Sequence, residues 1–295
     1  MPANIDISHP DKLLFPEGGI TKRDVADYYR KIADYMLPYL KERPLTLVWF
    51  PEGIQEKGFF NKHAPDYFPD SIPRYTVKKK EDNSQMQMLG VKNAKNLVYL
   101  AGQNIIEFHI PPAKISDLEI PDQIIFDFDP ADDDFDKVRQ ASLALRKLLD
   151  EWKIHSFVKT TGSSGMHVHI PIPPEHPFSK VKSISRKIAE KLQQTCPEIT
   201  TLKQRKDQRE DKVFIDYLRN EYSMTAVAPY SLRAKRGAPI ATPLEWSEVE
   251  DASLKPDSYH IKNIFYRLGQ KDDPWQTFNQ VNTSLDILEI EKKLD

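Results

Sequence analysis

Residues 124–129 have the sequence Ile-Ile-Phe-Asp-Phe-Asp, and Pro130 follows them. The apolar run predicts a buried β-strand, which ends at the proline because proline cannot donate a ladder hydrogen bond. Side chains two residues apart on a strand share a face and lie about 6.6 Å apart along the chain, so we expect Asp127 and Asp129 side by side. Paired carboxylates at the end of an apolar strand are costly unless a cation lies between them. The pattern therefore predicts a metal site, with an ordinary solvated turn at Asp129-Pro130 as the alternative.

Strands and helices alternate irregularly along the rest of the chain. Before residue 124, the patterns predict a helix from Thr21 to before Pro44, a strand over 45–50, and a helical turn with a strand over 96–110. After Pro130 they predict helices over about 135–152 and 179–194, a hairpin of strands over 157–159 and 166–172, and a strand over 213–218. This irregular order predicts a mixed α+β fold. A proline-bounded connection over 111–121 predicts two lobes of one domain, about 1–115 and about 116–295.

The charge balance is nearly neutral, with a net charge of −2 from 42 basic and 44 acidic residues. A protein that coats duplex DNA usually has a strong basic excess, so the overall balance does not indicate bulk nucleic-acid binding. Basic residues are nevertheless grouped in three runs, over 78–80, 203–212 and 233–236. Net neutrality can conceal a basic cleft, although solvated surface is the simpler interpretation of each run.

Cysteine content and hydropathy indicate the cellular compartment of the protein. Cys196 is the only cysteine, which excludes an intramolecular disulfide and a multi-cysteine zinc site and is typical of a reducing environment. No stretch approaches the roughly 18 apolar residues of a membrane span, and Met1 to Pro10 lack the pattern of a secretory signal. We therefore expect a cytoplasmic protein without a membrane partner.

A second candidate site is the hydroxyl-rich segment from Thr160 to His167, which contains Gly162 and Gly165. Such a turn can present backbone N–H groups and hydroxyls to a phosphate. An ordinary hairpin turn is the alternative. His167 and His169 alternate on the strand that follows, but a zinc site would need further ligands, and none is evident.

The third candidate is Asp216, a carboxylate inside the apolar strand over 213–218. A lone carboxylate there usually faces solvent, but Arg209 before it and Arg219 after it favour an anionic ligand nearby. Arg233 lies in a loop with Pro229 and Gly237, where a structural ion pair is the alternative.

Taken in order, several sequence blocks resemble the polymerase domain of bacterial ligase D, a branch of the archaeo-eukaryotic primase superfamily used in non-homologous end joining. The resemblance covers nearly the whole chain, and its specificity comes from the number of blocks in the same order. These blocks are 9–16, 19–22, 43–46, 58–62, 127–130, 161–167 and 225–233.

The resemblance implies a two-lobed primase-polymerase fold with the catalytic carboxylates on a small mixed sheet. It implies a template-dependent polymerase that adds nucleotides to a 3′ end, prefers ribonucleotides and needs Mn²⁺ or Mg²⁺. Its implied partners are DNA ends, primer-template and NTP or dNTP, with Ku and a DNA ligase expected by resemblance only. We find no adenylation motif of the Lys-x-Asp-Gly type in this chain.

The resemblance also assigns roles to individual residues. It matches the catalytic, metal-binding carboxylates with Asp127, Asp129 and Asp216, and the 5′-phosphate binders with Lys12 and Lys22. The residues matched to template stacking are Phe59 and Phe60, and those at or near nucleotide-binding positions are His109, Thr161, Ser163, Ser164, His167, Arg209 and Arg233. The family often has Lys where this chain has Ser164, so that contact with the triphosphate is open.

Two other functions fit parts of the pattern. A metal-dependent phosphatase or nuclease could use the same Asp pair, but haloacid-dehalogenase-type phosphatases expect Thr or Val four residues after the first Asp, and this chain has Ala131. A non-catalytic DNA-end-binding module could retain the fold alone. The three intact carboxylates argue against that module.

Overall fold

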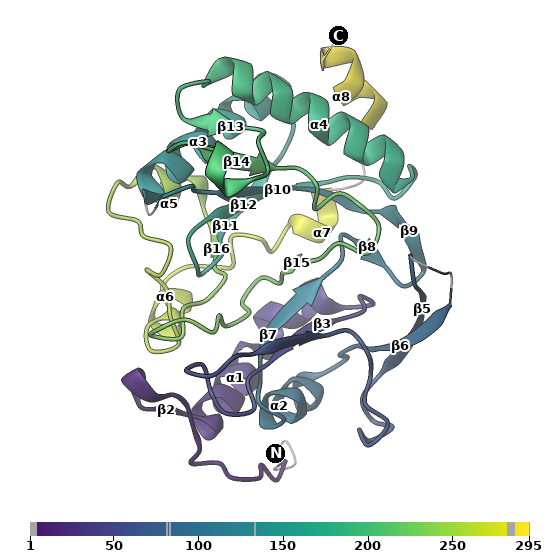
Figure 1. The fold of residues 1–295 in the computed structure, drawn as a ribbon, viewed down its shortest axis with the longest axis vertical. Coiled ribbons are helices and arrows are strands. Elements are labelled where there is room, and N and C mark those ends of the chain that lie inside the picture. The colour runs from purple at the N-terminus through teal and green to yellow at the C-terminus, as the bar shows by residue number, and fades with distance from the viewer. Residues whose placement is uncertain (1–4, 81, 83, 133, 282–286, 295) are drawn as a thin grey trace.

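The chain forms two packed units, each built on its own sheet (Figure 1). The computed structural model describes residues 5–80, 82, 84–132, 134–281 and 287–294. Over these residues, no helix has the length and apolar character needed to cross a bilayer. The helices and strands mix as predicted for an α+β fold.

The first lobe contains a four-stranded sheet in the order β15 (Ala226–Val227), β7 (Ile105–Ile110), β3 (Thr46–Trp49) and β4 (Phe59–Asn61). Helices α1 (Lys22–Leu40) and α2 (Ala94–Gly102) pack against each other and contribute to the same core. The predicted start of α1 is confirmed, because Thr21 and Asp24 form a reciprocal capping box. Short strands β1 (Leu13–Phe15) and β2 (Ile20–Thr21) flank η1 (Pro16–Gly18), and a separate hairpin joins β5 (Arg74–Lys78) to β6 (Gln85–Leu89).

The second lobe contains a six-stranded mixed sheet. Its order is β13 (Thr200–Thr201), β14 (Val213–Asp216), β10 (Gln123–Asp129), β12 (Met166–Pro171), β11 (Phe157–Thr160) and β16 (Pro243–Leu244). Only the β13–β14 pair is parallel among these strands. Apart from α3 and α4, the remaining elements from Ala113 onward are β8 (Ala113–Lys114), β9 (Asp117–Pro121), η2 (Lys206–Gln208), α5 (Trp246–Glu250), α6 (Ile264–Leu268), α7 (Phe278–Val281) and α8 (Ile287–Leu294).

Helices α3 (Phe135–Glu151) and α4 (Phe178–Thr195) cover one face of the six-stranded sheet. The strands present alternating residues to this face, so Phe126, Phe128 and Val168 are fully buried in the core that it forms. The intervening residues, including Asp127 and Asp129, therefore point to the opposite face, toward the first lobe. Burial of one face thus decides where the carboxylates lie.

The two hydrophobic cores interleave along the sequence. The first core takes residues up to Ile110, then residues from Ala228 to Phe278, whereas the second is built mainly from Ile124 to Leu254. The first core is therefore discontinuous in the sequence, because the later chain returns to it, and the lobe division near residue 115 stays a prediction. A buried ion pair between Arg43 and Asp122, 2.5 Å, also links the lobes.

Candidate active site

A row of polar side chains crosses the six-stranded sheet on the face opposite α3 and α4. In the antiparallel register, Asp127 of β10 pairs with Asp216 of β14 on one side and with His167 of β12 on the other, and His167 pairs with Lys159 of β11. Directly opposed residues share a face, so the row runs Asp216, Asp127, His167, Lys159. Asp129 lies on this face too, two residues from Asp127.

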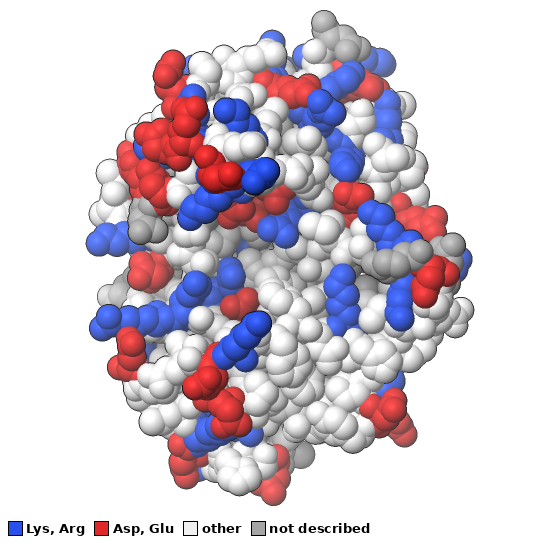
Figure 2. Space-filling view, in the orientation of Figure 1, with Lys and Arg blue, Asp and Glu red and all other residues white. Residues whose placement is uncertain are grey.

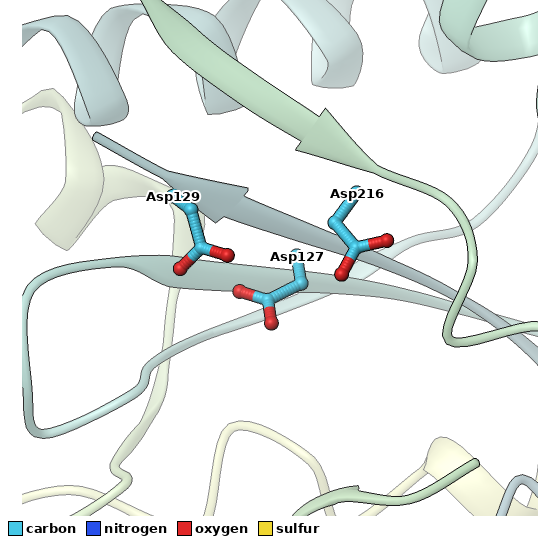
Figure 3. A group of neighbouring side chains, drawn as sticks. All are labelled: Asp127, Asp129 and Asp216. Atoms are coloured by element: carbon cyan, nitrogen blue, oxygen red, sulfur yellow. The ribbon is translucent and has the colours of Figure 1, made fainter. Parts of the chain in front are cut away.

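The three predicted carboxylates come together at the end of β10. Oxygen atoms of Asp127, Asp129 and Asp216 all lie within 4.8 Å of one another, and Figure 3 shows the side chains projecting from β10 and β14 into the same space. Burial raises the pKa of Asp129 to about 6, with a further contribution from Asp127. Burial likewise raises that of Asp216 to about 6, although Arg219 opposes the shift. Such a dense, buried set of hard oxygen donors fits Mg²⁺ or Mn²⁺.

The Arg219 guanidinium lies against two of these carboxylates. Its Nη2 is 3.0 Å from Asp127 Oδ2, and its Nε is 3.3 Å from Asp216 Oδ2. Arg219 follows Asp216 by three residues in the loop after β14, and the sequence indicated it only as a nearby positive charge. The structure makes it a direct partner of the carboxylates.

Glu107 of β7 links two predicted nucleotide-binding residues. It lies 2.9 Å from His109 Nε2 and 3.1 Å from Arg233 Nε. Burial alone would raise the pKa of Glu107, but the hydrogen bond from His109 and the charge of Arg233 outweigh it and lower that pKa to about 2. Glu107 is therefore ionised and orients both side chains. Sequence reasoning missed Glu107, although its i,i+2 spacing from His109 placed both on one face of a strand.

The predicted phosphate-binding turn is tied to Arg233. Arg233 Nη1 donates to the Thr161 carbonyl at 2.7 Å. The Thr161 hydroxyl accepts hydrogen bonds from the amides of Ser163 and Gly165, so it shapes the turn from within. Gly162 has a φ of +65°, and a Cβ there would lie 2.8 Å from a backbone atom of Ile240, so both conformation and space require glycine. Ser163 is half-buried, whereas the exposed Ser164 lies farther out.

Beneath this turn, His167 and Lys159 are buried in the sheet. His167 Nε2 is 3.2 Å from Asp127 Oδ1, and its pKa is lowered well below the usual value by burial and by Lys159, so the ring is neutral. Lys159 is completely buried, and its Nζ has no hydrogen-bond partner in the described part of the chain. Burial, then the charge of Arg233, lowers its pKa well below the usual value. Lys159 could not be singled out from its local sequence, because its place in the site depends on strand register.

Three other predicted residues lie outside this cluster. Arg209 stacks on Phe214, 4.4 Å from the ring centroid, beside Asp129 but hydrogen-bonded to loop carbonyls. Lys12 Nζ lies 2.9 Å from Glu52, and Lys22 Nζ donates to the Ser8 carbonyl at 2.8 Å. Burial, followed by the charge of Lys12, lowers the pKa of Lys22, so the two lysines form a separate basic site near the start of α1.

The two predicted stacking residues differ in position. Phe60 is 66% exposed, and its ring contacts that of His109, so it borders the carboxylate site. Phe59 contacts Trp49 instead and is 47% exposed. Adjacent residues on strand β4 point to opposite faces. The structure therefore brings Phe60 to the site and directs Phe59 toward the core side of the sheet.

A pocket of about 140 Å³ lies at the centre of this arrangement. Its walls come from both lobes and include Thr225 together with residues described above: His109, Asp127, Asp129, Thr161, Ser163, Ser164, His167, Arg219 and Arg233. Figure 2 shows this face of the molecule hollowed between the lobes, with Lys and Arg on both sides of the hollow. A carboxylate wall facing a cationic wall can hold metal ions together with a phosphate-bearing ligand.

Comparisons with known proteins agree with the geometry. The family model "LigD, primase-polymerase domain" matches residues 21–275. The bifunctional non-homologous end joining protein LigD of Bacillus subtilis is 32% identical over 270 residues, 91% of this chain and 43% of that protein. The multifunctional LigD protein of Pseudomonas aeruginosa is 32% identical over 279 residues, 94% of this chain and 33% of that protein.

A solved structure agrees as well. The polymerase domain from Mycobacterium tuberculosis ligase D, in complex with DNA, matches with a TM-score of 0.86 and 26% identity, covering 94% of this chain and 98% of that one. The chain spans less than half the length of the curated relatives described above, yet nearly all of this solved domain. The chain belongs to the LigD primase-polymerase domain family.

Proposed function

We propose that this chain is a template-dependent nucleotidyltransferase that extends 3′ ends of DNA during double-strand-break repair by end joining, with a preference for ribonucleotides. The single observation that carries the proposal is the carboxylate cluster, in which Asp127, Asp129 and Asp216 bring oxygens within 4.8 Å of one another. Family membership supports a polymerase with divalent-metal dependence. The choice between Mn²⁺ and Mg²⁺, like the ribonucleotide preference, is part of the proposal.

The carboxylates would hold the metal ions. Bound there, the ions would lower the pKa of the primer 3′-hydroxyl and neutralise charge on the phosphates. Asp216 and Asp129, with pKa values of about 6, are ionised at neutral pH and ready to ligate. Asp127 is fixed between two neighbouring strands, so the cluster is preorganised rather than assembled on binding.

The opposite wall would hold the incoming nucleotide. Arg233, fixed by Glu107 and the Thr161 carbonyl, can donate charge-assisted hydrogen bonds to phosphate oxygens. Ser163, in the turn, and neutral His109, beside Phe60, can contact phosphate and sugar. With Ser164 in place of the family's usual Lys, Arg233 carries more of the charge for the triphosphate.

DNA ends would be bound by two further surfaces. Phe60 offers an exposed ring beside the catalytic pocket for an unpaired template base. Lys12 and Lys22 lie together near the N-terminus of α1, where the positive end of the helix dipole adds to their attraction for a phosphate. The Mycobacterium tuberculosis domain is in complex with DNA, which supports this interpretation. Ku and a DNA ligase as partners, and a cytoplasmic location, stay predictions.

The experiment is incubation of the protein with a labelled primer-template, Mn²⁺ and NTPs or dNTPs. Primer extension is the expected result, faster with NTPs. Shortened products would instead favour a nuclease that uses the same carboxylates. Unchanged DNA that is nevertheless bound would favour the non-catalytic end-binding module.

A further inference from the structure

A second pocket lies beside the catalytic one, between the β5–β6 hairpin and the second lobe. Its volume is about 260 Å³, and Thr225 lines both pockets. Its apolar wall includes Val77, Met88 and Phe178, and its rim carries four lysines, Lys62, Lys78, Lys79 and Lys80. We call it the lysine-rimmed pocket. None of the residues that we assign to metal, triphosphate or 5′-phosphate lies in it.

One buried polar atom in this pocket lacks a partner. Thr46 of β3 lines the pocket and is 2% exposed, and its Oγ1 has no hydrogen-bond partner among the residues that the structure describes. A buried hydroxyl without a partner costs free energy unless a ligand or water satisfies it. Thr46 also pairs with His109 across β3 and β7, so it connects the wall of this pocket to the catalytic site.

The loop that follows the catalytic strand β14 closes the pocket. Tyr222 donates from its hydroxyl to the Lys78 carbonyl at 2.8 Å, and Lys62 Nζ donates to the Ser223 carbonyl at 3.2 Å. Lys80 forms an ion pair with Glu221 at 2.6 Å. These contacts join the hairpin and Lys62, which follows β4, to the loop of the other lobe, within a few residues of Arg219.

We infer that the lysine-rimmed pocket binds one unstacked nucleotide of the single-stranded template, with its base against the apolar wall and its phosphates on the lysines. The inference rests on the proposed function. Aromatic or apolar surface combined with cationic groups is the chemistry that single-stranded nucleic acid requires. The volume lies just below the roughly 300–1,000 Å³ of ordinary small-molecule sites, which suits a single base.

The template strand is the expected occupant, because the pocket lies next to the surface that we assign to the template. Lys62 follows Phe60 by two residues, and Phe60 contacts His109 at the catalytic pocket. A template strand that stacks on Phe60 would therefore reach Lys62 and the pocket mouth next. The Thr46 hydroxyl would hydrogen-bond to the polar edge of the inserted base, which gives that buried atom its partner.

The test is abasic scanning of the template overhang, with binding measured by fluorescence anisotropy in the absence of metal and nucleotide. For the wild type, removal of one particular base in the overhang should weaken binding about tenfold. Val77→Trp fills the pocket and should abolish that penalty. Thr76→Trp adds the same bulk to an exposed position of the same strand, which does not line the pocket, and should retain it. An equal penalty in both variants, or no sensitive position in the wild type, would overturn the inference.

A second variant keeps the inference testable if Val77→Trp fails to fold. Thr46→Val has nearly the same shape and removes only the unpaired hydroxyl, so the melting temperature should stay the same or rise while the abasic penalty shrinks. A lowered melting temperature with an unchanged penalty would show a purely structural role. Primer extension by the wild type tests the proposed function separately. Primer extension by the wild type, together with an abasic penalty in the variants equal to that of the wild type, would refute the nucleotide-binding role of the pocket and leave the proposed function intact.

Discussion

Replacing Arg219 with Gln should raise the affinity of the metal-free protein for Mn²⁺. The Arg219 guanidinium lies 3.0 Å from Asp127 and 3.3 Å from Asp216, so a cation must share these carboxylates with an existing positive charge. Unit charges about 4 Å apart interact by about 4 kcal/mol at an effective dielectric constant of 20. Arg219 is 30% exposed and can move aside, so we expect a smaller gain, about 1.4 kcal/mol or tenfold.

The assay is titration with Mn²⁺, followed by electron paramagnetic resonance of the free ion, without DNA or nucleotide. Arg186→Gln, which changes an exposed arginine on α4 whose ion-pair partner is Glu190 of the same helix, is the matched control and should bind Mn²⁺ as the wild type does. The metal-free Arg219→Gln protein should also melt at a lower temperature, because the carboxylates lose their partner, and Mn²⁺ should restore more of its stability. Weaker Mn²⁺ binding by Arg219→Gln would refute the idea that Arg219 competes with the cation for the carboxylates. It would show instead that Arg219 positions the carboxylates.

Three further predictions concern titration, nucleotide and DNA ends. The folded-state pKa values of Asp129 and Asp216, about 6, exceed the unfolded value of about 3.9. Protonation of these carboxylates therefore stabilises the metal-free fold fully below about pH 4, and this stabilisation is lost as the pH rises through 6. Mn²⁺ affinity should rise over the same window, and calorimetric titrations showing no change between pH 5 and 7 would exclude these pKa values. Arg233→Ala and His167→Ala should each raise the KM for NTP in steady-state extension about tenfold or more, since a charged hydrogen bond contributes about 1.5–3 kcal/mol. Template binding should change little. An unchanged KM in both variants would show that the triphosphate binds elsewhere. The double substitution Lys12→Ala with Lys22→Ala should erase the gain in binding from a 5′-phosphate at a gap without slowing extension on unphosphorylated DNA, and an equal phosphate preference before and after would remove these lysines from the site.

Long periodic elements were predictable because their own residues determine them. The cap at Thr21, the apolar strand before Asp127 and the helix after Pro130 all appear near the expected bounds. The strands β4, β5, β6, β15 and β16 were not predicted, because they are short and their pairing partners define them. Without β4, the sequence could not show that Phe59 and Phe60 point to opposite faces.

The clustering of the three carboxylates was predictable, whereas their immediate partners were not. Asp127 and Asp129 follow from strand alternation, and family resemblance adds Asp216. Arg219 and Lys159 become part of the site only through the register of β14 and β11 against their neighbours, which no local pattern reveals. Glu107 is different, because its spacing from His109 was visible in the sequence.

We propose that the carboxylate cluster carries out nucleotidyl transfer, and single-turnover primer extension by Asp127→Asn is the decisive measurement. Asp132→Asn, an exposed carboxylate paired with Lys137 outside the cluster, is the matched control. At saturating Mn²⁺ and NTP, Asp127→Asn should extend about a hundredfold more slowly or worse, the size of loss seen when one transition-state contact is removed. Its DNA binding and the rate of the control should stay close to those of the wild type. Extension by Asp127→Asn within a few-fold of the wild-type rate would contradict the claim.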